Sequence, residues 1–462
     1  MTDYDAIIIG SGIGGTAVGA LLASENFKTL IIEKNGKIGG RCSTYEKEGF
    51  KIDIGVHSFA RSNKGPLGKI LEKIGMKDAI NWSIVKEGEG RWYYKGDFYG
   101  LPSDFTKLIP KSDLIGLLKL VNEATKLKDT SKLDGLDLQS WLNKFTTNSL
   151  VHKYISLICG LYFVIPYHQA STGEFIRCLT TLNKYQKIGY PEGGCISIPL
   201  AFLDGMKKNG GKLMIKHKVT KILVEDEEVK GVELDNGDQI TSKLVISNGG
   251  IKNTVFDLVG SKHFENDFLK KINELEYSLS ALTLKIALKK RINPYKMVVL
   301  IGLEDTEDYY NAIMNGKVPE DIDYFIPIPS NYHRSMAPEG KQLLTAGTFV
   351  PRINFEQNKD KWIENSMNSL ENVFPGLSEN MLWYDITTPE DIYNSYGKEA
   401  SVIGVSQIVN QVGINRPSVS LPIKGLYMVG GDAGGWGIGT ELAAQSAFEC
   451  FNAIIHNLSI QK

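Results

Sequence analysis

Residues 4–15 read YDAIIIGSGIGG. The apolar run predicts a short buried strand, and the three glycines after it have the G-x-G-x-x-G spacing of a dinucleotide-binding turn. In such a turn Gly10 makes the bend tight, Gly12 lets the backbone approach a pyrophosphate, and Gly15 lets a helix pack closely on the strand. The free N–H groups at the start of that helix would bind the diphosphate. The residues expected to contact the cofactor here are Gly10, Gly12, Ile13, Gly14 and Gly15.

A second apolar strand, residues 29–32, ends at Glu33, 21 residues after Gly12. An acid about 20 residues after the middle glycine typically binds the ribose hydroxyls of a dinucleotide. We therefore expect Glu33, with the adjoining Lys34, at the cofactor. The alternative is a glycine-rich turn before an ordinary helix, with a solvated glutamate.

The composition limits the class of protein. A chain of 462 residues exceeds the size at which a single core stops growing, so two domains are expected. The 52 basic and 53 acidic side chains give a net charge of −1, which argues against a nucleic-acid partner. The five cysteines are widely spaced and no ligand spacing is evident, so we expect reduced thiols in a cytoplasmic protein and no metal. The most apolar window, residues 155–166, is too short to span a bilayer.

The end of the chain repeats the strand–glycine–helix order. Residues 425–430 predict a buried strand that ends at Gly431 and Asp432, and a glycine-rich loop then precedes a helix from about Thr440. NAD needs no second site of this kind, whereas FAD does, because its ribityl chain and isoalloxazine ring extend beyond the first diphosphate site. We therefore expect FAD rather than a nicotinamide as the tightly bound cofactor.

The spacing of these motifs resembles the flavin-containing amine oxidoreductase superfamily, and most closely its phytoene desaturase, carotenoid isomerase and retinol saturase branch. The resemblance covers essentially the whole chain, with specific motifs at both ends. It implies a Rossmann-type α/β FAD-binding domain with an inserted α+β substrate domain. The expected FAD-binding segments are residues 1–100, 191–255 and 416–462, and the expected substrate-domain segments are residues 101–190 (helical) and 256–415 (strands and helices).

The resemblance also implies roles for particular residues. Backbone groups would follow the diphosphate and the flavin, a backbone group of Val219 would face the adenine, and Asp432 would bind the ribityl chain. Peptide N–H groups of the closing loop would face the pyrimidine end of the flavin. The further cofactor contacts expected in this way are Gly39, Gly40, Arg41, Gly55, Val56, Val219, Asn248, Gly431, Asp432, Gly437 and Ile438.

Two residues are candidates for catalysis. His57 would lie near the flavin and could handle protons, although a packing histidine fits the sequence as well. Glu441 follows the closing loop, where this branch usually has a proline- and glycine-rich segment and this chain has Trp436 and then Gly437. Its carboxylate could relay a proton or anchor substrate, or it could simply favour the start of the last helix.

The expected reaction is hydride transfer between flavin N5 and a carbon of an apolar, isoprenoid- or carotenoid-like substrate, with an unidentified electron acceptor or donor. The alternatives are oxidation of an amine or a porphyrinogen, and a non-catalytic electron-transfer flavoprotein subunit. The leucine-rich helical section, residues 107–187, suggests peripheral contact with a membrane.

Overall fold

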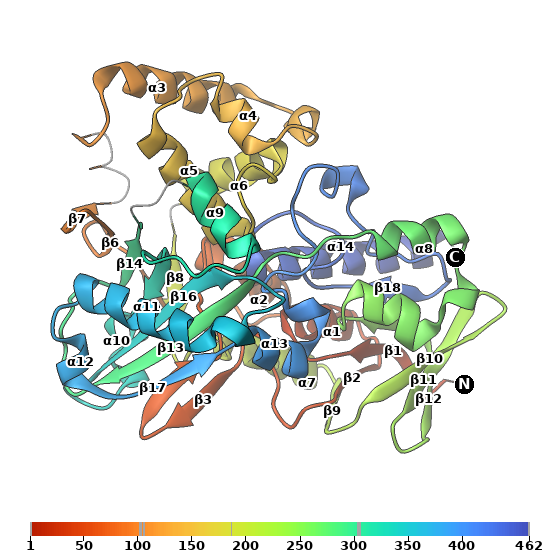
Figure 1. Cartoon of the computed structure of the whole chain (residues 1–462). Coiled ribbons are helices and arrows are strands. Elements are labelled where there is room, and N and C mark those ends of the chain that lie inside the picture. The colour runs from red at the N-terminus through yellow and green to blue at the C-terminus, as the bar shows by residue number, and fades with distance from the viewer. Residues whose placement is uncertain (1, 101–103, 105–106, 186, 303–305, 461–462) are drawn as a thin grey trace.

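The computed structural model describes residues 2–100, 104, 107–185, 187–302 and 306–460 (Figure 1). The described residues contain two seven-stranded sheets, whose strand orders are β10-β11-β12-β1-β2-β9, with β18 beside β12, and β17-β13-β16-β15-β14-β6-β7. Two further antiparallel pairs are the β3–β4 hairpin and the pair β5–β8, whose strands are far apart in the chain. This arrangement confirms a Rossmann-type α/β part combined with an α+β part.

The first sheet is built from three separate stretches of the chain. Its strands are β1 (Tyr4–Ile9), β2 (Thr29–Glu33), β9 (Lys212–Ile215), β10 (Val219–Glu225), β11 (Glu228–Leu234), β12 (Gln239–Ser247) and β18 (Leu426–Met428). β1 is parallel to both β2 and β12, and β18 is parallel to β12. The carboxyl ends of β1, β12 and β18 therefore meet at one edge of the sheet, which is where open α/β sheets bind ligands.

Three helices pack together beside this sheet: α1 (Ile13–Ser24), α7 (Ser197–Lys208) and α14 (Gly439–Ile460). α1 is buried over nearly its whole length because its small residues let neighbouring elements approach from every side. Further helices are α2 (Pro66–Lys73) and α8 (Asn266–Asn273), and a π-helix covers Asn253–Val259.

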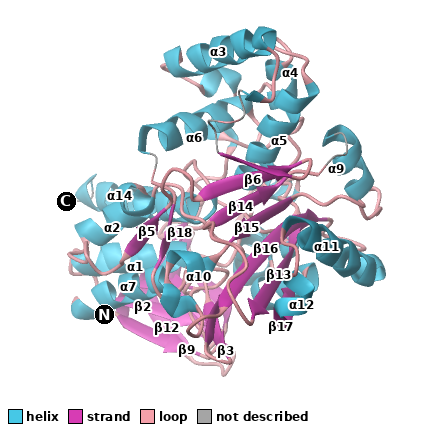
Figure 2. Ribbon diagram, turned by 90° about the vertical axis from the view of Figure 1, so that its left-hand side faces the viewer, coloured by secondary structure: helices cyan, strands magenta, loops and turns pink. Residues whose placement is uncertain are grey.

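The second sheet and its helices form the rest of the molecule (Figure 2). Its strands are β6 (Gly90–Tyr94), β7 (Asp97–Gly100), β13 (Ser280–Leu288), β14 (Met297–Leu300), β15 (Tyr324–Pro327), β16 (Gln342–Val350) and β17 (Met381–Thr387). The helices are α3 (Lys111–Lys126), α4 (Leu138–Leu142), α5 (Ser149–Phe163), α6 (Thr172–Tyr185), α9 (Thr306–Met314), α10 (Pro329–Tyr332), α11 (Lys359–Val373), α12 (Leu377–Asn380) and α13 (Pro389–Tyr396). Helices α3 to α6 gather at one end of the molecule. The small pairs are β3 (Thr44–Lys47) with β4 (Phe50–Asp53), and β5 (Trp82–Ile84) with β8 (Gly189–Pro191).

One segment lies elsewhere than expected. Residues 1–100 were assigned to the FAD-binding part, but β6 and β7 belong to the second sheet, where β6 pairs in parallel with β14. The hairpin alone does not show which sheet it joins, because that pairing is made with residues about 200 positions later. The remaining domain boundaries stay a prediction.

The contact between Gly15 and the turn before it fixes how α1 sits on β1. A Cβ atom at Gly15 would lie 2.1 Å from the carbonyl oxygen of Gly10, which is backbone and has no freedom to move aside. Gly15→Ala is therefore expected to lower the free energy of unfolding by about 1–3 kcal/mol, as other overpacking substitutions do. Urea unfolding followed by circular dichroism measures this change.

The matched control is Gly135→Ala, because a Cβ at Gly135 meets no atom within 4 Å. That variant is expected to stay within about 0.5 kcal/mol of the wild type. Equal stability of the two variants would contradict the close packing of α1.

Candidate functional site

The glycine turn after β1 forms a cradle at the start of α1. No side chain caps α1 in the described structure, so the N–H groups of its first turn face out of the helix end. A Cβ at Gly12 would lie 2.7 Å from Nδ2 of Asn248, and a Cβ at Gly14 would lie 2.8 Å from the backbone N of Gly430. The glycines thus leave a narrow space beside the backbone, and Asn248 borders it. Asn248, one of the predicted cofactor contacts, therefore lies at the glycine turn.

Glu33 lies beside the same turn. Its buried carboxylate accepts hydrogen bonds from the backbone N of Ser11 at 2.9 Å, from Ser11 Oγ at 2.7 Å and from the backbone N of Asn35 at 2.9 Å. This position at the carboxyl end of β2 suits an acid that reaches a ribose. Lys34 is exposed next to it, and Val219, the first residue of β10, is buried. The contacts expected of these residues with FAD stay predictions.

A second pair of glycines, Gly39 and Gly40, lies beside the same turn. The backbone N of Gly39 donates to the carbonyl of Ser11 at 3.0 Å, and both Gly39 and Gly40 have positive φ. Arg41 then donates from Nη1 to the carbonyls of Ser401 and Val402. Burial lowers the pKa of Arg41, and the charge of Asp432 opposes that change. Sequence reasoning did not anticipate the segment at residues 401–402.

Asp432 joins three segments at the sheet edge. It is fully buried, and its carboxylate accepts the backbone N–H of Ile251 at 3.0 Å and of Val405 at 3.2 Å. Gly404 must lack a side chain, since a Cβ there would lie 2.3 Å from Asp432 Oδ1. The carbonyl of Gly431, the residue before Asp432, accepts a hydrogen bond from Arg416. The expected ribityl contact of Asp432 stays a prediction.

The segment at residues 55–57 follows β4 and contacts the second sheet. Val56 packs against β16, because a Cβ at Gly347 would lie 2.5 Å from Cγ2 of Val56. Nδ1 of His57 is 3.1 Å from the carbonyl oxygen of Gly55, and its ring is stacked on Phe59 with 6.0 Å between ring centroids.

Charged and thiol groups surround His57. Its Nδ1 is 3.8 Å from Asp53, and one ring nitrogen lies within 4.8 Å of the thiols of Cys42 and Cys195. Burial lowers the pKa of His57, but Cys195, Asp53 and Gly55 together raise it to about 9. A carboxylate and two thiols are thus close to the His57 ring. The catalytic role of His57 and the expected absence of a metal both stay predictions.

The closing loop is held by a polar network from the helical part of the molecule. Oε1 of Glu174, on α6, accepts the backbone N–H of Gly437 at 3.2 Å. Nε2 of Gln407 donates to that same Oε1 at 2.8 Å and to the carbonyl of Gly437 at 2.9 Å. The N–H of Gly437 thus satisfies a buried carboxylate that needs donors, and the expected contact of Gly437 with FAD stays a prediction. The contact expected of Ile438 stays a prediction.

Glu441 binds an arginine from a distant part of the chain. Its Oε1 accepts the backbone N–H of Arg61 at 2.7 Å, and its Oε2 accepts Nε of Arg61 at 2.5 Å. The guanidinium lies over the ring of Trp436, 5.6 Å from its centroid. Burial raises the pKa of Glu441, and Arg61 opposes the rise. Glu441 is also the acid of the first turn of α14, so it combines the position favoured at a helix start with the pair to Arg61, and its expected catalytic role stays a prediction.

Apolar side chains enclose this loop. Trp436 and Ile438 pack in one cluster with the helical section, which contributes aromatic rings from α5 and α6 and from the turn between them. Those rings belong to Tyr162, Phe163, Tyr167 and Phe175. Phe163, Tyr167 and Phe175 are buried, and Tyr162 is partly buried.

Residues 13–293, more than half of the chain, match the family model described as flavin containing amine oxidoreductase. The chain is 25% identical to prolycopene isomerase 1 of an Oncidium hybrid cultivar, over 100% of this chain and 85% of that protein. It is also 25% identical to the all-trans-retinol 13,14-reductase of Danio rerio, over 93% of this chain and 82% of that protein.

The crystal structure of an oxidoreductase from Methanosarcina mazei has the same fold, with a TM-score of 0.78, 20% sequence identity and coverage of 98% and 100% of the two chains. These similarities confirm the resemblance drawn from the motifs, including its carotenoid- and retinol-related branch. The glycine cradle, the acid at the end of β2 and the acid after β18 are groups that fit FAD. The chain belongs to the flavin-containing amine oxidoreductase family, and its cofactor is FAD.

Proposed function

We propose that this flavin oxidoreductase acts on an apolar, isoprenoid-type substrate, by hydride transfer between N5 of FAD and a substrate carbon. The reaction would be a desaturation, a saturation or an isomerisation, and the first two require an external electron acceptor or donor. The protein would bind and orient substrate and cofactor and exclude water, while FAD supplies the redox chemistry.

The observation that carries the proposal is the environment of the closing loop at residues 436–438. In this fold family that loop is expected beside the flavin, and here it packs among apolar and aromatic side chains of the helical section. The two buried carboxylates near it, Glu174 and Glu441, are each paired with an arginine. An amine substrate is a cation that needs a free carboxylate, so this environment favours an apolar molecule.

The names of similar proteins support the same substrate class, since the relatives are a prolycopene isomerase and a retinol reductase. We assign the cofactor to the glycine cradle, with Glu33 at the ribose and Arg41 and Asp432 along the diphosphate and ribityl parts. The backbone of Gly55 and Val56 would border the flavin ring, and Val219 would border the adenine.

Turnover by the purified holoenzyme tests this function. Photoreduced and oxidised protein are each incubated without oxygen with a polyene such as prolycopene, and the flavin spectrum and the extracted polyenes are followed. We expect a change in the polyene that FAD-free Gly12→Val protein does not produce. Rapid flavin reduction by putrescine with an unchanged polyene would support the amine-oxidase alternative instead. No turnover of either substrate would favour the electron-transfer alternative.

We propose further that Glu441 positions Arg61 behind Trp436 and is not a proton relay. Glu441→Gln would leave a buried arginine without its counter-charge, which costs about 3–5 kcal/mol of unfolding free energy. The double variant Arg61→Met with Glu441→Leu removes both charges and is expected to recover most of that loss. Urea unfolding gives the energies, and FAD content checks the site.

A proton relay makes the opposite prediction for the same variant. Glu441→Gln would then fold with normal stability, and reduction of the flavin by substrate would slow by roughly 100-fold or more. Stopped-flow measurements with the substrate found above distinguish the two roles.

We also propose that α3 docks on a membrane surface, from which an apolar substrate could enter. Ile115, Leu118 and Val121 on this helix are 57%, 69% and 47% exposed, and the helix also carries exposed lysines. Figure 1 shows α3 at the outer end of the helical part. None of the described helices is long and apolar enough to cross a membrane. An apolar helix face with lysines beside it suits the surface of an anionic bilayer.

Flotation with liposomes containing anionic lipid measures this docking. Replacing both Ile115 and Leu118 with glutamate is expected to weaken binding by at least roughly 10-fold, because each side chain contributes about 1.5–3 kcal/mol when buried. The control is Ile215→Glu, at a 40% exposed residue of β9, a strand that Figures 1 and 2 show at the opposite end of the molecule from α3. Equal flotation of the two variants would contradict a role for α3.

A further inference from the structure

Two cysteines and a histidine meet at the open end of the β3–β4 hairpin. Cys42, His57 and Cys195 each offer one atom, a thiol sulfur or a ring nitrogen, that lies within 4.8 Å of the other two. The two cysteines are 2% and 0% exposed, and the side chain of His57 is 12% exposed. Sequence spacing does not reveal this group, because Cys42 and Cys195 are 153 positions apart.

The hairpin explains why Cys42 and His57 lie close together. Cys42 stands two residues before β3, and His57 follows β4 by four residues. Thr44 and Asp53 are partners at the open end of this antiparallel pair. The chain therefore enters and leaves the hairpin at the same place, and it brings one thiol and the imidazole there.

Backbone hydrogen bonds bring Cys195 to the same end of the hairpin. Its N–H donates to Oδ1 of Asp53 at 3.1 Å, and the N–H of Ile196 donates to Oγ1 of Thr44 at 3.2 Å. Gly194 permits this approach, since a Cβ there would lie 2.5 Å from Oγ1 of Thr44. The third group is thus positioned without the use of its thiol.

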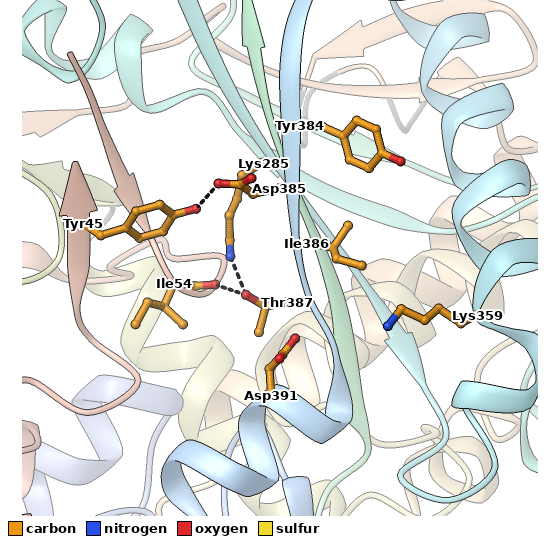
Figure 3. A pocket seen from close by; sticks show the side chains of 9 residues that line it. All are labelled: Tyr45, Ile54, Lys285, Lys359, Tyr384, Asp385, Ile386, Thr387 and Asp391. Carbon is orange, nitrogen blue, oxygen red and sulfur yellow. Dashed lines mark hydrogen bonds between the residues drawn. The ribbon is translucent and has the colours of Figure 1, made fainter. Parts of the chain in front are cut away.

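The hairpin is itself fastened to the second sheet (Figure 3). Oγ1 of Thr387 donates to the carbonyl of Ile54 at 3.2 Å, and the hydroxyl of Tyr45 donates to Asp385 at 2.9 Å. Both bonds join the hairpin segment to β17. Side chains on such a fixed backbone need little rearrangement to bind an ion together.

The ring of His57 is also held in one orientation. Its Nδ1 lies 3.1 Å from the carbonyl oxygen of Gly55, and the ring is stacked on Phe59. The two thiols make only long hydrogen bonds in comparison. Sγ of Cys42 donates to the carbonyl of Cys195 at 3.2 Å, and Sγ of Cys195 donates to the carbonyl of Ser43 at 3.5 Å. A thiol is a weak donor, so an ion that replaced these bonds would cost the protein little.

The remaining cysteines show what ordinary packing looks like in this protein. A buried cysteine often serves only as a small apolar side chain. Within the part of the chain that the structure describes, no other cysteine belongs to a group of three possible metal ligands. These other cysteines, all of them buried, are Cys159, Cys178 and Cys450.

We propose that Cys42, Cys195 and His57 bind one Zn²⁺ ion. Thiolate sulfur and imidazole nitrogen are ligands that zinc prefers, and a water molecule would complete its tetrahedron. Each ligand atom gives up the proton it carries and donates a lone pair to the ion, so binding releases protons and exchanges no electrons. Two thiolates balance the charge of the ion, which suits a site removed from water.

The ion would lie next to the cofactor. Cys42 follows Arg41 and His57 follows Val56, and both of these neighbours are assigned to FAD above. Zinc would therefore fasten together two segments that border the cofactor. A ligand role for His57 replaces the proton handling expected of it, and the ion replaces the expectation of a metal-free protein, which rested on the wide spacing of the cysteines.

Zinc-edge X-ray absorption on the wild-type holoenzyme tests the site. Protein with FAD bound is incubated with ZnCl₂, passed through gel filtration, and analysed for metal by mass spectrometry. We expect one zinc per chain, with two sulfur atoms at about 2.3 Å and the nitrogen at about 2.0–2.1 Å. MgCl₂ in place of zinc should leave no bound metal, because Mg²⁺ prefers oxygen ligands. No retained zinc, or zinc without sulfur neighbours, would overturn the proposal.

Serine variants identify the ligands. Cys42→Ser and Cys195→Ser are each expected to weaken zinc binding by at least roughly 100-fold, since even the loss of a group that only supports a ligand costs up to that much. Calorimetric titration against a competing chelator measures the affinity. Cys450→Ser is the matched control, because Cys450 is equally buried and lies outside the group.

Equal zinc affinity of Cys195→Ser and Cys450→Ser, at normal FAD content, would contradict the site. The wild-type absorption spectrum decides the question if a variant does not fold. Neither measurement involves turnover, so both outcomes leave the proposed reaction and substrate class untouched.

Discussion

The buried carboxylate of Asp432 is the constraint on which the arrangement of the site depends. It accepts hydrogen bonds from the backbone N–H groups of Ile251 and Val405, which lie far from it and from each other in the sequence. A charge that is fully removed from water is stable only with such donors and with opposite charge nearby. Burial lowers the pKa of Arg41 and of Arg416, and the charge of Asp432 raises both pKa values. The two arginines therefore lie close enough to Asp432 to interact with its charge. The carboxyl ends of β12 and β18 are therefore fixed to the loop near residue 404.

Hydrogen bonds and ion pairs of two other buried acids hold the closing loop against the helical part. Glu174 bonds the N–H of Gly437 and pairs with Arg177, while Glu441 binds both the backbone and the side chain of Arg61. Each acid is buried, and each has an arginine that limits the cost of desolvation. The loop at residues 436–438 is thus held at Gly437 and, three residues beyond its end, at Glu441, and apolar side chains pack around Trp436 and Ile438. Such fixed contacts are what a site that orients substrate against a cofactor requires.

Local features of the fold could be predicted from the sequence because their causes are local. The turn after β1 requires glycine, and the structure shows why, since a side chain at Gly15 would clash with the carbonyl of Gly10. Likewise Glu33 follows its strand directly, so its place at the sheet edge follows from the strand itself. The position of Asp432 after the last strand also follows from the local pattern, whereas its role and the place of His57 came only through resemblance to a known family.

The sequence by itself determined the dinucleotide-binding turn, the acid after the second strand, the return to strand and glycine at the end of the chain, and therefore the cofactor. Only the tertiary structure decided which sheet β6 and β7 join, and which partners Gly437 and Glu441 take. The physical reason is the length of chain between partners. Strand propensity and glycine spacing act over a few residues, whereas Glu441 and Arg61 are 380 positions apart and meet only because two sheets and their helices pack together.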